Sequence, residues 1–325
     1  MRNADYRWPE LLYGALRPTL ATLHLWTQIA GKIRLAKTPW VNHSWHVTLY
    51  VSARGLTTGL IPHGGSGFEL EFDLVSHALI VRVCDGAEER VALAPRSVAS
   101  FYAELMEKLA ALGIPARIDL RPNELPFATP FPEDMAPREY EPEAAHRFWR
   151  ALVQCDRVFR DFRTGFLGKV SPVHFFWGSF DLAVTRFSGR RAPLHPGGVP
   201  HLPDAVAQEA YSHEVSSAGF WPGDDNMPYA AFYSYCYPAA AGFAEAAVLP
   251  REAHFDSKLG EFLLPYDAVC RAEDPDAVLL RFLQSTYDAA ANAGHWDRAA
   301  LETARGQIGK PWRIEGSAAE TKRGG

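Results

Sequence analysis

The sequence predicts an α+β protein made of two helix–four-strand–helix units, with antiparallel sheets that carry helices packed on one face. Two observations support this class. The spacing of apolar residues changes from helical to alternating and back within each half of the chain, and a proline-rich segment separates the halves. A length of 325 residues also suits two domains or one large duplicated one.

The first half begins with a predicted helix over residues 19–33, because Leu20, Leu23, Trp26, Ile29 and Ile33 recur every three or four residues. After Pro39 the period changes to two, which predicts a half-buried strand over residues 47–53. Further strands are predicted over residues 68–74, 78–83 and 91–93. A second helix begins at Ser97 and ends at Gly113.

The segment 121–142 contains six prolines and is predicted to be a stiff linker between a first half, residues 1–120, and a second half, residues 143–300. Residues 301–325 are a predicted flexible tail. The second half repeats the order of the first, with a predicted helix over 142–168 and a last helix over 274–294. Between them we expect strands over 172–187, 211–220, 231–237, 243–249 and 261–264.

The two halves are predicted to be an internal duplication. Residues 30–33 match residues 167–170, and an offset of 133 keeps the apolar phase of the strands that follow, whereas an offset of 132 aligns Trp45 with Trp177. Helix-grip, TATA-binding-protein-like and hotdog units all have this outline, and the sequence does not choose among them.

Composition excludes several classes of function. Lys and Arg number 33 against 38 Asp and Glu, and a net charge of −5 argues against nucleic-acid binding. The chain lacks a signal peptide and a membrane-spanning stretch, and its four cysteines are far apart, so we expect a cytoplasmic protein with reduced thiols and no membrane partner. Phosphate-loop, dinucleotide and nucleophile-elbow motifs are missing, which disfavours nucleotide hydrolysis and α/β-hydrolase chemistry.

The densest group of polar and aromatic residues lies in residues 168–186. Asp181 is flanked by Phe180 and Leu182 on a predicted strand, where an aspartate is disfavoured and needs a partner. The sequence leaves two readings of Asp181 open. It forms a salt bridge with Arg186 or Lys169, or its carboxylate lines a pocket as a general base or a metal ligand.

Histidines supply the other candidates. His46 shares a strand face with Thr48, and His213 with Glu214 is expected to converge with His174 and Asp181 at the sheet. A set of two histidines and a carboxylate would suit zinc or iron, but no HExxH or HxD spacing is present, so the sequence assigns neither a metal nor a cofactor.

These observations give two sets of candidate site residues. The candidate catalytic residues are Asp181, His46, His174, His213 and Glu214, and the candidate ligand-binding residues are Arg186, Lys169, Trp177, Ser179 and Trp221. Because 12% of the residues are aromatic and many lie beside these polar groups, we expect an aromatic-walled pocket in the second half or between the halves.

Two hypotheses for the function follow. In the first, the protein is a small-molecule enzyme in which Arg186 anchors an anionic substrate. In the second, it is a non-catalytic small-molecule-binding or scaffold protein whose polar cluster is a structural network. The sequence gives neither the reaction nor the oligomeric state.

Several segments of the chain resemble those of a bacterial family known only as domain of unknown function 5996. The matching segments are residues 22–29, 31–36, 42–56, 168–190, 211–214, 219–223 and 262–266. They cover nearly the whole chain, roughly residues 8–298. The resemblance implies one coherent unit, and it implies no activity, cofactor or catalytic residue.

Overall fold

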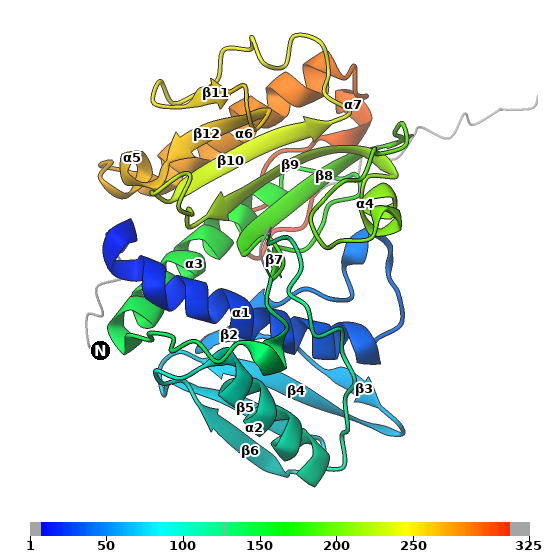
Figure 1. Cartoon of the computed structure of the whole chain (residues 1–325). Helices are drawn as coiled ribbons and strands as arrows, with labels where there is room; N and C mark the ends of the chain where they lie inside the picture. The colour runs from blue at the N-terminus through cyan, green and yellow to red at the C-terminus, as the bar shows by residue number, and fades with distance from the viewer. Residues whose placement is uncertain (1–7, 126–127, 313–325) are drawn as a thin grey trace, which may run out of the picture.

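Two antiparallel sheets with their helices form the α+β fold in a computed structural model of the chain, which describes residues 8–125 and 128–312 (Figure 1). The predicted α+β class with antiparallel sheets is thereby confirmed, but each sheet has six strands within the described residues, and the predicted duplication of a helix–four-strand–helix unit stays a prediction. The long helix α1 (Tyr13–Lys37) crosses the middle of the molecule between the two sheets (Figure 1). It packs against α2 (Val98–Ala111) on one side and α3 (Pro142–Arg163) on the other.

The first sheet has the order β1-β2-β4-β5-β6, and β3 also pairs with β4. Alternation along β4 separates its two faces, because Phe68, Leu70 and Phe72 are buried in the core while Glu69, Glu71 and Asp73 occupy the other face. The strands are β1 (Tyr50–Val51), β2 (Gly55–Thr57), β3 (Ile61–His63), β4 (Ser66–Asp73), β5 (Ala78–Val83) and β6 (Glu88–Ala92).

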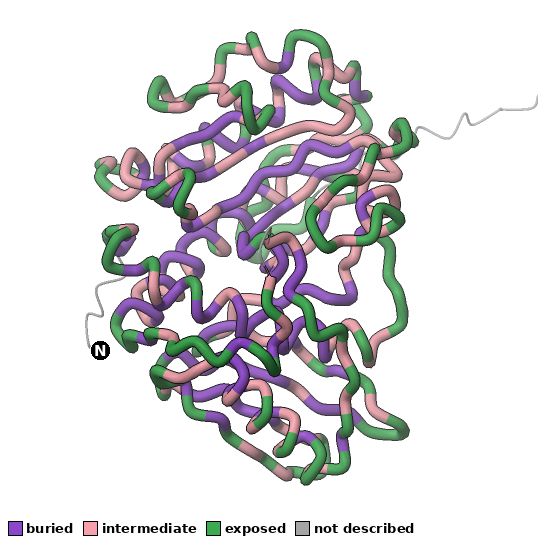
Figure 2. Tube along the Cα trace, viewed as in Figure 1, coloured by how far each residue is buried: buried purple, intermediate pink, exposed green. Residues whose placement is uncertain are grey.

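The second sheet has the order β11-β12-β10-β9-β8-β7, and α3 and α6 (Pro275–Ala293) pack on one of its faces. The strands are β7 (His174–Phe176), β8 (Asp181–Arg191), β9 (His213–Trp221), β10 (Ala231–Tyr237), β11 (His254–Asp256) and β12 (Glu261–Pro265). Figure 2 shows long buried runs along β8 and β9, which lie in the interior of this sheet.

Five shorter helical segments connect the longer elements within the described residues. They are η1 (Asn42–Ser44), η2 (Phe131–Glu133), α4 (Asp204–Ala210), α5 (Tyr266–Cys270) and α7 (Arg298–Leu301). The helix starts predicted at Ser97 and Asp274 are observed, and both side chains cap their helices by accepting a hydrogen bond from a backbone N–H, of Ser100 and Ala277 respectively.

The two sheets meet at an isolated bridge between Leu49 and Phe175, whose backbone groups exchange two hydrogen bonds of 2.9 and 2.8 Å. Two side-chain hydrogen bonds beside it, Thr48 to His174 and Lys169 to His43, also join residues 126 positions apart. These contacts join the two sheets, and the internal duplication with its offset of 133 or 132 stays a prediction.

The proline-rich segment is fastened along α1 at both of its ends. Gln28 of α1 exchanges two hydrogen bonds with the backbone of Asn123, at 2.8 and 3.0 Å. Further along, the hydroxyl of Thr22 donates to the carbonyl of Glu139 at 2.6 Å, and that of Thr19 accepts from the backbone N–H of Glu141 at 2.9 Å. Polar residues of α1 thus position the segment that follows the first unit.

Three predicted elements differ in the structure. The predicted strand over 172–187 is divided into β7 and β8 by a turn at residues 177–180, where Phe180 has a φ of 59°. Residues 243–249 contain no strand, and β11 follows instead at His254–Asp256. The predicted strand over 47–53 is reduced to β1, because this chain segment turns at the junction between the sheets.

Candidate functional site

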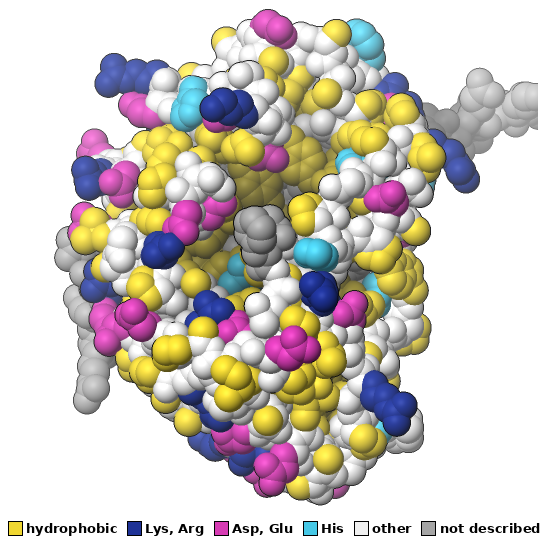
Figure 3. Space-filling model, viewed as in Figure 1, with side chains coloured by type: hydrophobic (Ala, Val, Ile, Leu, Met, Phe, Trp, Pro, Cys, Tyr) yellow, Lys and Arg dark blue, Asp and Glu magenta, His cyan; other side chains and the backbone are white. Residues whose placement is uncertain are grey.

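A cavity of about 510 Å³ lies between α1 and the second sheet. Its walls come from the first half of α1, from residues 124–125 and 137–139 of the proline-rich segment, from the β7–β8 turn and from residues 221–225 at the end of β9. Figure 3 shows that the molecule is hollowed on this side, with hydrophobic side chains deep in the hollow. A concave site of this volume is suited to a small molecule.

Glu124 enters the cavity from the proline-rich segment. Its backbone N–H donates to the carbonyl of Pro200 at 2.8 Å, and its φ of 62° turns the chain sharply at this residue. The side chain of the preceding Asn123 accepts a hydrogen bond from Lys32 of α1. The carboxylate of Glu124 lies directly against Gly178, where any side chain would collide with it. The position of Glu124 is therefore fixed from three sides.

Asp181 lies immediately behind the cavity wall. Its carboxylate accepts a hydrogen bond of 2.5 Å from Ser179, which lines the cavity, and another from the hydroxyl of Tyr233 on β10. Tyr233 reaches Asp181 by crossing β9 at Gly219, its register partner, where a β-carbon would overlap the tyrosine ring. Asp181 is 6% exposed and forms no ion pair with a described residue.

Three carboxyl groups on or beside this face of the second sheet have raised pKa values. Burial, followed by repulsion from Asp181, raises the pKa of Glu124 to about 7. The same two causes, with a further contribution from Asp256, raise the pKa of Glu261 on β12 to about 7. Burial also raises the pKa of Asp181, against the effect of its two hydroxyl donors. Glu124 and Glu261 therefore titrate near neutral pH, the range in which a carboxyl group can both accept and donate a proton.

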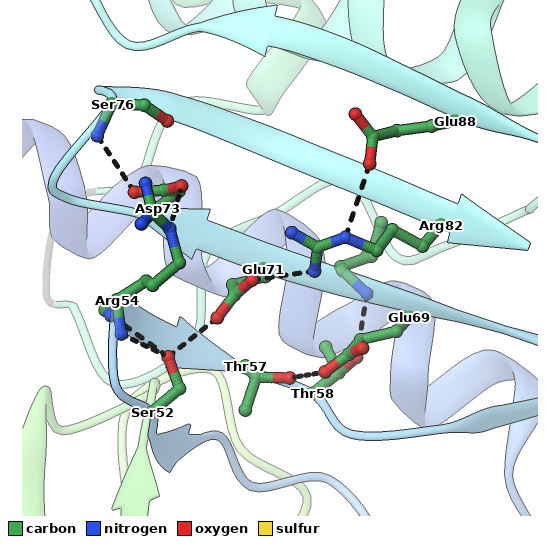
Figure 4. A network of polar contacts seen from close by, with 12 residues as sticks. Ser52, Arg54, Thr57, Thr58, Glu69, Glu71, Asp73, Ser76, Arg82 and Glu88 are labelled. Atoms are coloured by element: carbon green, nitrogen blue, oxygen red, sulfur yellow. Dashed lines mark hydrogen bonds and ion pairs between the residues drawn. The ribbon is translucent and has the colours of Figure 1, made fainter.

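The first sheet shows the opposite arrangement for its acidic residues (Figure 4). There Arg82 donates to Glu71 at 2.7 Å and Arg54 donates to Asp73 at 2.6 Å. Burial alone would raise the pKa of Asp73, but the hydrogen bond from Arg54 and those from backbone N–H groups lower it to about 2. Glu71 and Asp73 on the first sheet are thus paired with arginine, whereas Glu124 and Asp181 form no ion pair with a described residue.

Aromatic rings form much of the surroundings. Phe180 lines the cavity and stacks on His24 of α1 with ring centroids 4.8 Å apart, and Trp221 contributes to the wall from the end of β9. Nε2 of His24 lies 2.8 Å from the carbonyl oxygen of Gly178, so this nitrogen is a donor. Burial lowers the pKa of His24 to about 4, which keeps the imidazole neutral.

Only part of the predicted site is assembled at this cavity. Ser179 and Trp221 line it, and Asp181 lies one hydrogen bond behind it. Arg186 lies on the opposite face of β8 from Asp181, because residues an odd number of positions apart on a strand point to opposite faces. Its guanidinium packs against the rings of Phe162 and Tyr287, 3.6 and 4.4 Å from their centroids. The predicted convergence of Arg186 with Asp181 therefore does not occur.

Three of the predicted residues lie at the junction of the sheets. Nδ1 of His174 contacts the hydroxyl of Thr48 at 2.9 Å, and burial lowers the pKa of His174 to about 3. His46 contacts the backbone of Val41, and Trp177 donates to the carbonyl of Val47 at 2.7 Å. None of these three lines the cavity among its described residues.

The remaining predicted residues form separate contacts. Glu214 accepts hydrogen bonds from Ser188 and Arg190, of 2.8 and 2.7 Å, and is a paired acid. Lys169 donates to His43 at 2.7 Å, and the ring of His213 lies 6.0 Å from that of His43. The predicted convergence of His213 and Glu214 with His174 and Asp181 is not observed. Both residues lie at the start of β9, at the opposite end of the strand from Trp221.

Sequence reasoning missed several residues of the assembled site. They are His24, Glu124, Tyr233 and Glu261, together with the supporting Gln28, Lys32, Asn123 and Gly219. One signal was available, because His24, Gln28 and Lys32 recur every four residues along α1 and so share one side of the helix. Glu124 had no comparable signal, since its segment follows neither helical nor strand spacing.

The described residues include no grouping of three or more His, Cys, Asp or Glu side chains that could hold a metal ion. None of the helices in the described ranges is long and apolar enough to cross a membrane. A family model described as "Family of unknown function (DUF5996)" matches residues 8–303. No curated protein and no solved structure matches the chain.

Proposed function

This chain belongs to the DUF5996 family of unknown function, and we propose that it is a small-molecule enzyme whose general acid–base group is Glu124. The main support for the proposal is the position and the raised pKa of the Glu124 carboxyl group. It lines the cavity, its pKa is raised to about 7 by burial and by Asp181, and no described residue neutralises it. A carboxyl group with this pKa exchanges protons readily at neutral pH.

Asp181 and Tyr233 have a positioning role in this proposal. The negative charge of Asp181 keeps the Glu124 carboxyl protonated to a higher pH than an isolated glutamate, and Ser179 and Tyr233 hold the Asp181 carboxylate in place. Glu124 would then remove a proton from a substrate bound against Trp221 and Phe180, and would return it in a later step.

Arg138 would hold an anionic group of the substrate. It lines the cavity and pairs with Asp134 at 2.5 Å through Nη2, while its buried Nε has no hydrogen-bond partner among the described residues. The guanidinium charge at the cavity wall would attract a carboxylate or phosphate group of the substrate. Arg138 would therefore anchor the anionic group, a role that was predicted for Arg186.

The proposal is tested with the near-isosteric variant Glu124→Gln. Wild type, Glu124→Gln and a control, Glu69→Gln, are incubated with a cell metabolite extract, and mass spectrometry follows compounds that disappear or form. Glu69 is a suitable control because it lies on the first sheet and accepts a hydrogen bond from Thr57. We expect the same conversion with wild type and Glu69→Gln and none with Glu124→Gln.

Two results would contradict the proposal. A conversion that Glu124→Gln retains would exclude Glu124 as the acid–base group. A metabolite that co-purifies with wild type and is never converted would favour the alternative, a non-catalytic small-molecule-binding protein. Buffer pH in both experiments should span 6–8, because the Glu124 carboxyl titrates near 7.

A further inference from the structure

We propose that Lys169 is a reactive amine that forms an imine with small carbonyl compounds, with His43 as its proton acceptor. The two residues lie at the junction of the sheets, outside the cavity that contains Glu124. The proposal is independent of the function assigned to that cavity. It rests on the geometry of a nucleophile, a base and a group that orients the base.

The tautomer of His43 is fixed by its surroundings. Nδ1 of His43 lies 2.8 Å from the carbonyl oxygen of Ala210, which can only accept, so Nδ1 carries the proton. Nε2 therefore presents its lone pair, and the Nζ atom of Lys169 lies 2.7 Å from it. The backbone N–H of His43 donates to both carboxylate oxygens of Glu209, at 3.0 and 2.8 Å, which anchors the histidine on α4.

Lys169 is held in place without a carboxylate partner of its own. Its carbonyl accepts a hydrogen bond of 3.0 Å from the backbone N–H of Phe187, and its Nζ lies 4.8 Å from the Phe187 ring and 5.1 Å from the Trp45 ring. Among the described residues it forms no ion pair, because Glu209 is used by the backbone of His43. The residue nevertheless remains exposed to solvent, so a reagent can reach the amine.

Burial and the neighbouring charges shift the pKa of the Lys169 amine in opposite directions. Burial lowers the pKa of Lys169, and the charge of Glu209 opposes that effect. Burial also lowers the pKa of His43, which His213 and Lys169 lower further, so His43 keeps its accepting lone pair at neutral pH. The two rings favour the ammonium form, and the lone pair of His43 binds an N–H of either form.

The chemistry is a condensation that needs no oxidant. Nε2 of His43 accepts a proton from the Lys169 ammonium, and the freed lone pair of Nζ forms a bond to the carbonyl carbon. The carbonyl oxygen takes up a proton, and the carbinolamine then loses water as the C=N double bond forms. Aldehydes or ketones with an apolar substituent would suit the site, because Trp45 and Phe187 flank the amine with apolar faces.

Reductive labelling of the whole protein tests this proposal. The folded chain is treated at pH 7.5 with benzaldehyde and sodium cyanoborohydride, and peptide mass spectrometry gives the labelling rate of each lysine. Lys258 and Lys310 are internal references, since both are exposed. We expect Lys169 to be labelled several times faster than either reference, because burial lowers the pKa of its amine and the lone pair of His43 lies 2.7 Å from Nζ. Equal or slower labelling of Lys169 would overturn the proposal.

A second variant examines the part played by His43. In His43→Asn the imidazole lone pair is removed, and residue 43 keeps a side chain that tolerates its φ of 60°. In the folded variant we expect the labelling rate of Lys169 to fall to that of Lys258, with Lys258 unchanged. An unchanged rate at Lys169 would exclude His43 as the proton acceptor. If His43→Asn does not fold, the comparison of Lys169 with Lys258 in wild type decides the proposal.

Discussion

The hydroxyl of Tyr233 on β10 donates a hydrogen bond to the carboxylate of Asp181 on β8, across the whole width of β9. Gly219 makes this possible, because the tyrosine ring occupies the space that a side chain on β9 would fill. The contact connects a buried acid on one strand with a donor two strands away. It also explains how Asp181 is accommodated in a strand without a basic partner.

We expect Gly219→Ala to break this contact. The added methyl group would displace the ring of Tyr233, so that Asp181 would keep only Ser179 as a side-chain donor, and it would also collide with the backbone carbonyl of Leu182. The lost hydrogen bond to a buried charged group should lower the free energy of unfolding by about 1.5–3 kcal/mol, and the collision should add to this loss; urea denaturation measures the total.

A double-mutant cycle isolates the cause. If Gly219→Ala acts through the Tyr233 hydroxyl, Tyr233→Phe should cost little more in the Gly219→Ala background than the first change alone. Fully additive losses would show that the glycine has another role. Ser217→Ala, two residues away on β9, is a control that removes neutral side-chain contacts with Thr185, at 2.8 Å, and with Tyr235.

Glu124→Gln is expected to stabilise the protein above neutral pH. The pKa of Glu124 is raised from 4.5 to about 7 in the folded state, so wild type loses stability as the pH rises from about 4.5 through 7. The amide carries no charge and escapes this loss, on the order of 2–3 kcal/mol at pH 8. Unfolding curves between pH 5 and pH 8 measure the difference.

Whether a Glu→Gln substitution raises or lowers the free energy of unfolding at pH 8 distinguishes an unpaired acid from one that is paired in the structure. Glu71 accepts hydrogen bonds from Arg82 and Ser52, so Glu71→Gln should weaken the first sheet at the same pH. A Glu124→Gln variant that is less stable than wild type at pH 8 would mean that a donor neutralises Glu124. Loss of activity combined with increased stability is the pattern expected of a catalytic residue.

Regular spacing explains which parts of the fold could be predicted from sequence. Residues 19–33 lie within α1 as predicted, and Asp181 was singled out because an aspartate between Phe180 and Leu182 breaks the pattern of a strand. Glu124 could not be found in this way, because its position depends on hydrogen bonds from α1 to Asn123, which is 95 residues from Gln28 in the chain. Long-range contacts of this kind leave no period in the sequence.

Arg186 illustrates a residue whose type suggested a function that its strand position does not support. It shares the face of Leu182 and Val184, and it is 1% exposed. Burial lowers its pKa to about 10, and two of its nitrogens lack hydrogen-bond partners among the described residues. The cost of burying this charge offsets much of what its ring contacts contribute.

We therefore expect Arg186→Met and Arg186→Ala to differ strongly. Methionine keeps the apolar stem between Phe162 and Tyr287 without a buried charge, so the free energy of unfolding should change by less than about 1 kcal/mol. Alanine leaves a cavity among these rings and should cost about 2–4 kcal/mol. Equal losses for the two variants, measured by chemical denaturation, would show that the charge itself is stabilising.

An exposed ion pair lies at the mouth of the cavity. Arg17 of α1 binds Asp225 through two hydrogen bonds, one of 2.6 Å from Nη2, and Tyr13 donates to the same carboxylate at 3.1 Å. Both side chains of the pair are more than half exposed, at 53% and 66%. Such an exposed pair contributes little to global stability and is screened by salt.

Its main effect should be local, because it fastens the chain after β9 to α1 across the cavity. We expect Arg17→Gln to leave the melting temperature nearly unchanged and to speed hydrogen exchange of the amides in residues 222–229, measured by mass spectrometry. Wild type in 0.5 M NaCl should approach the same exchange rates. Arg251→Gln, which removes the exposed pair with Glu252 elsewhere on the surface, should leave residues 222–229 unaffected. Exchange in Arg17→Gln that matches wild type at low salt would show that the ion pair does not restrain the mouth of the cavity.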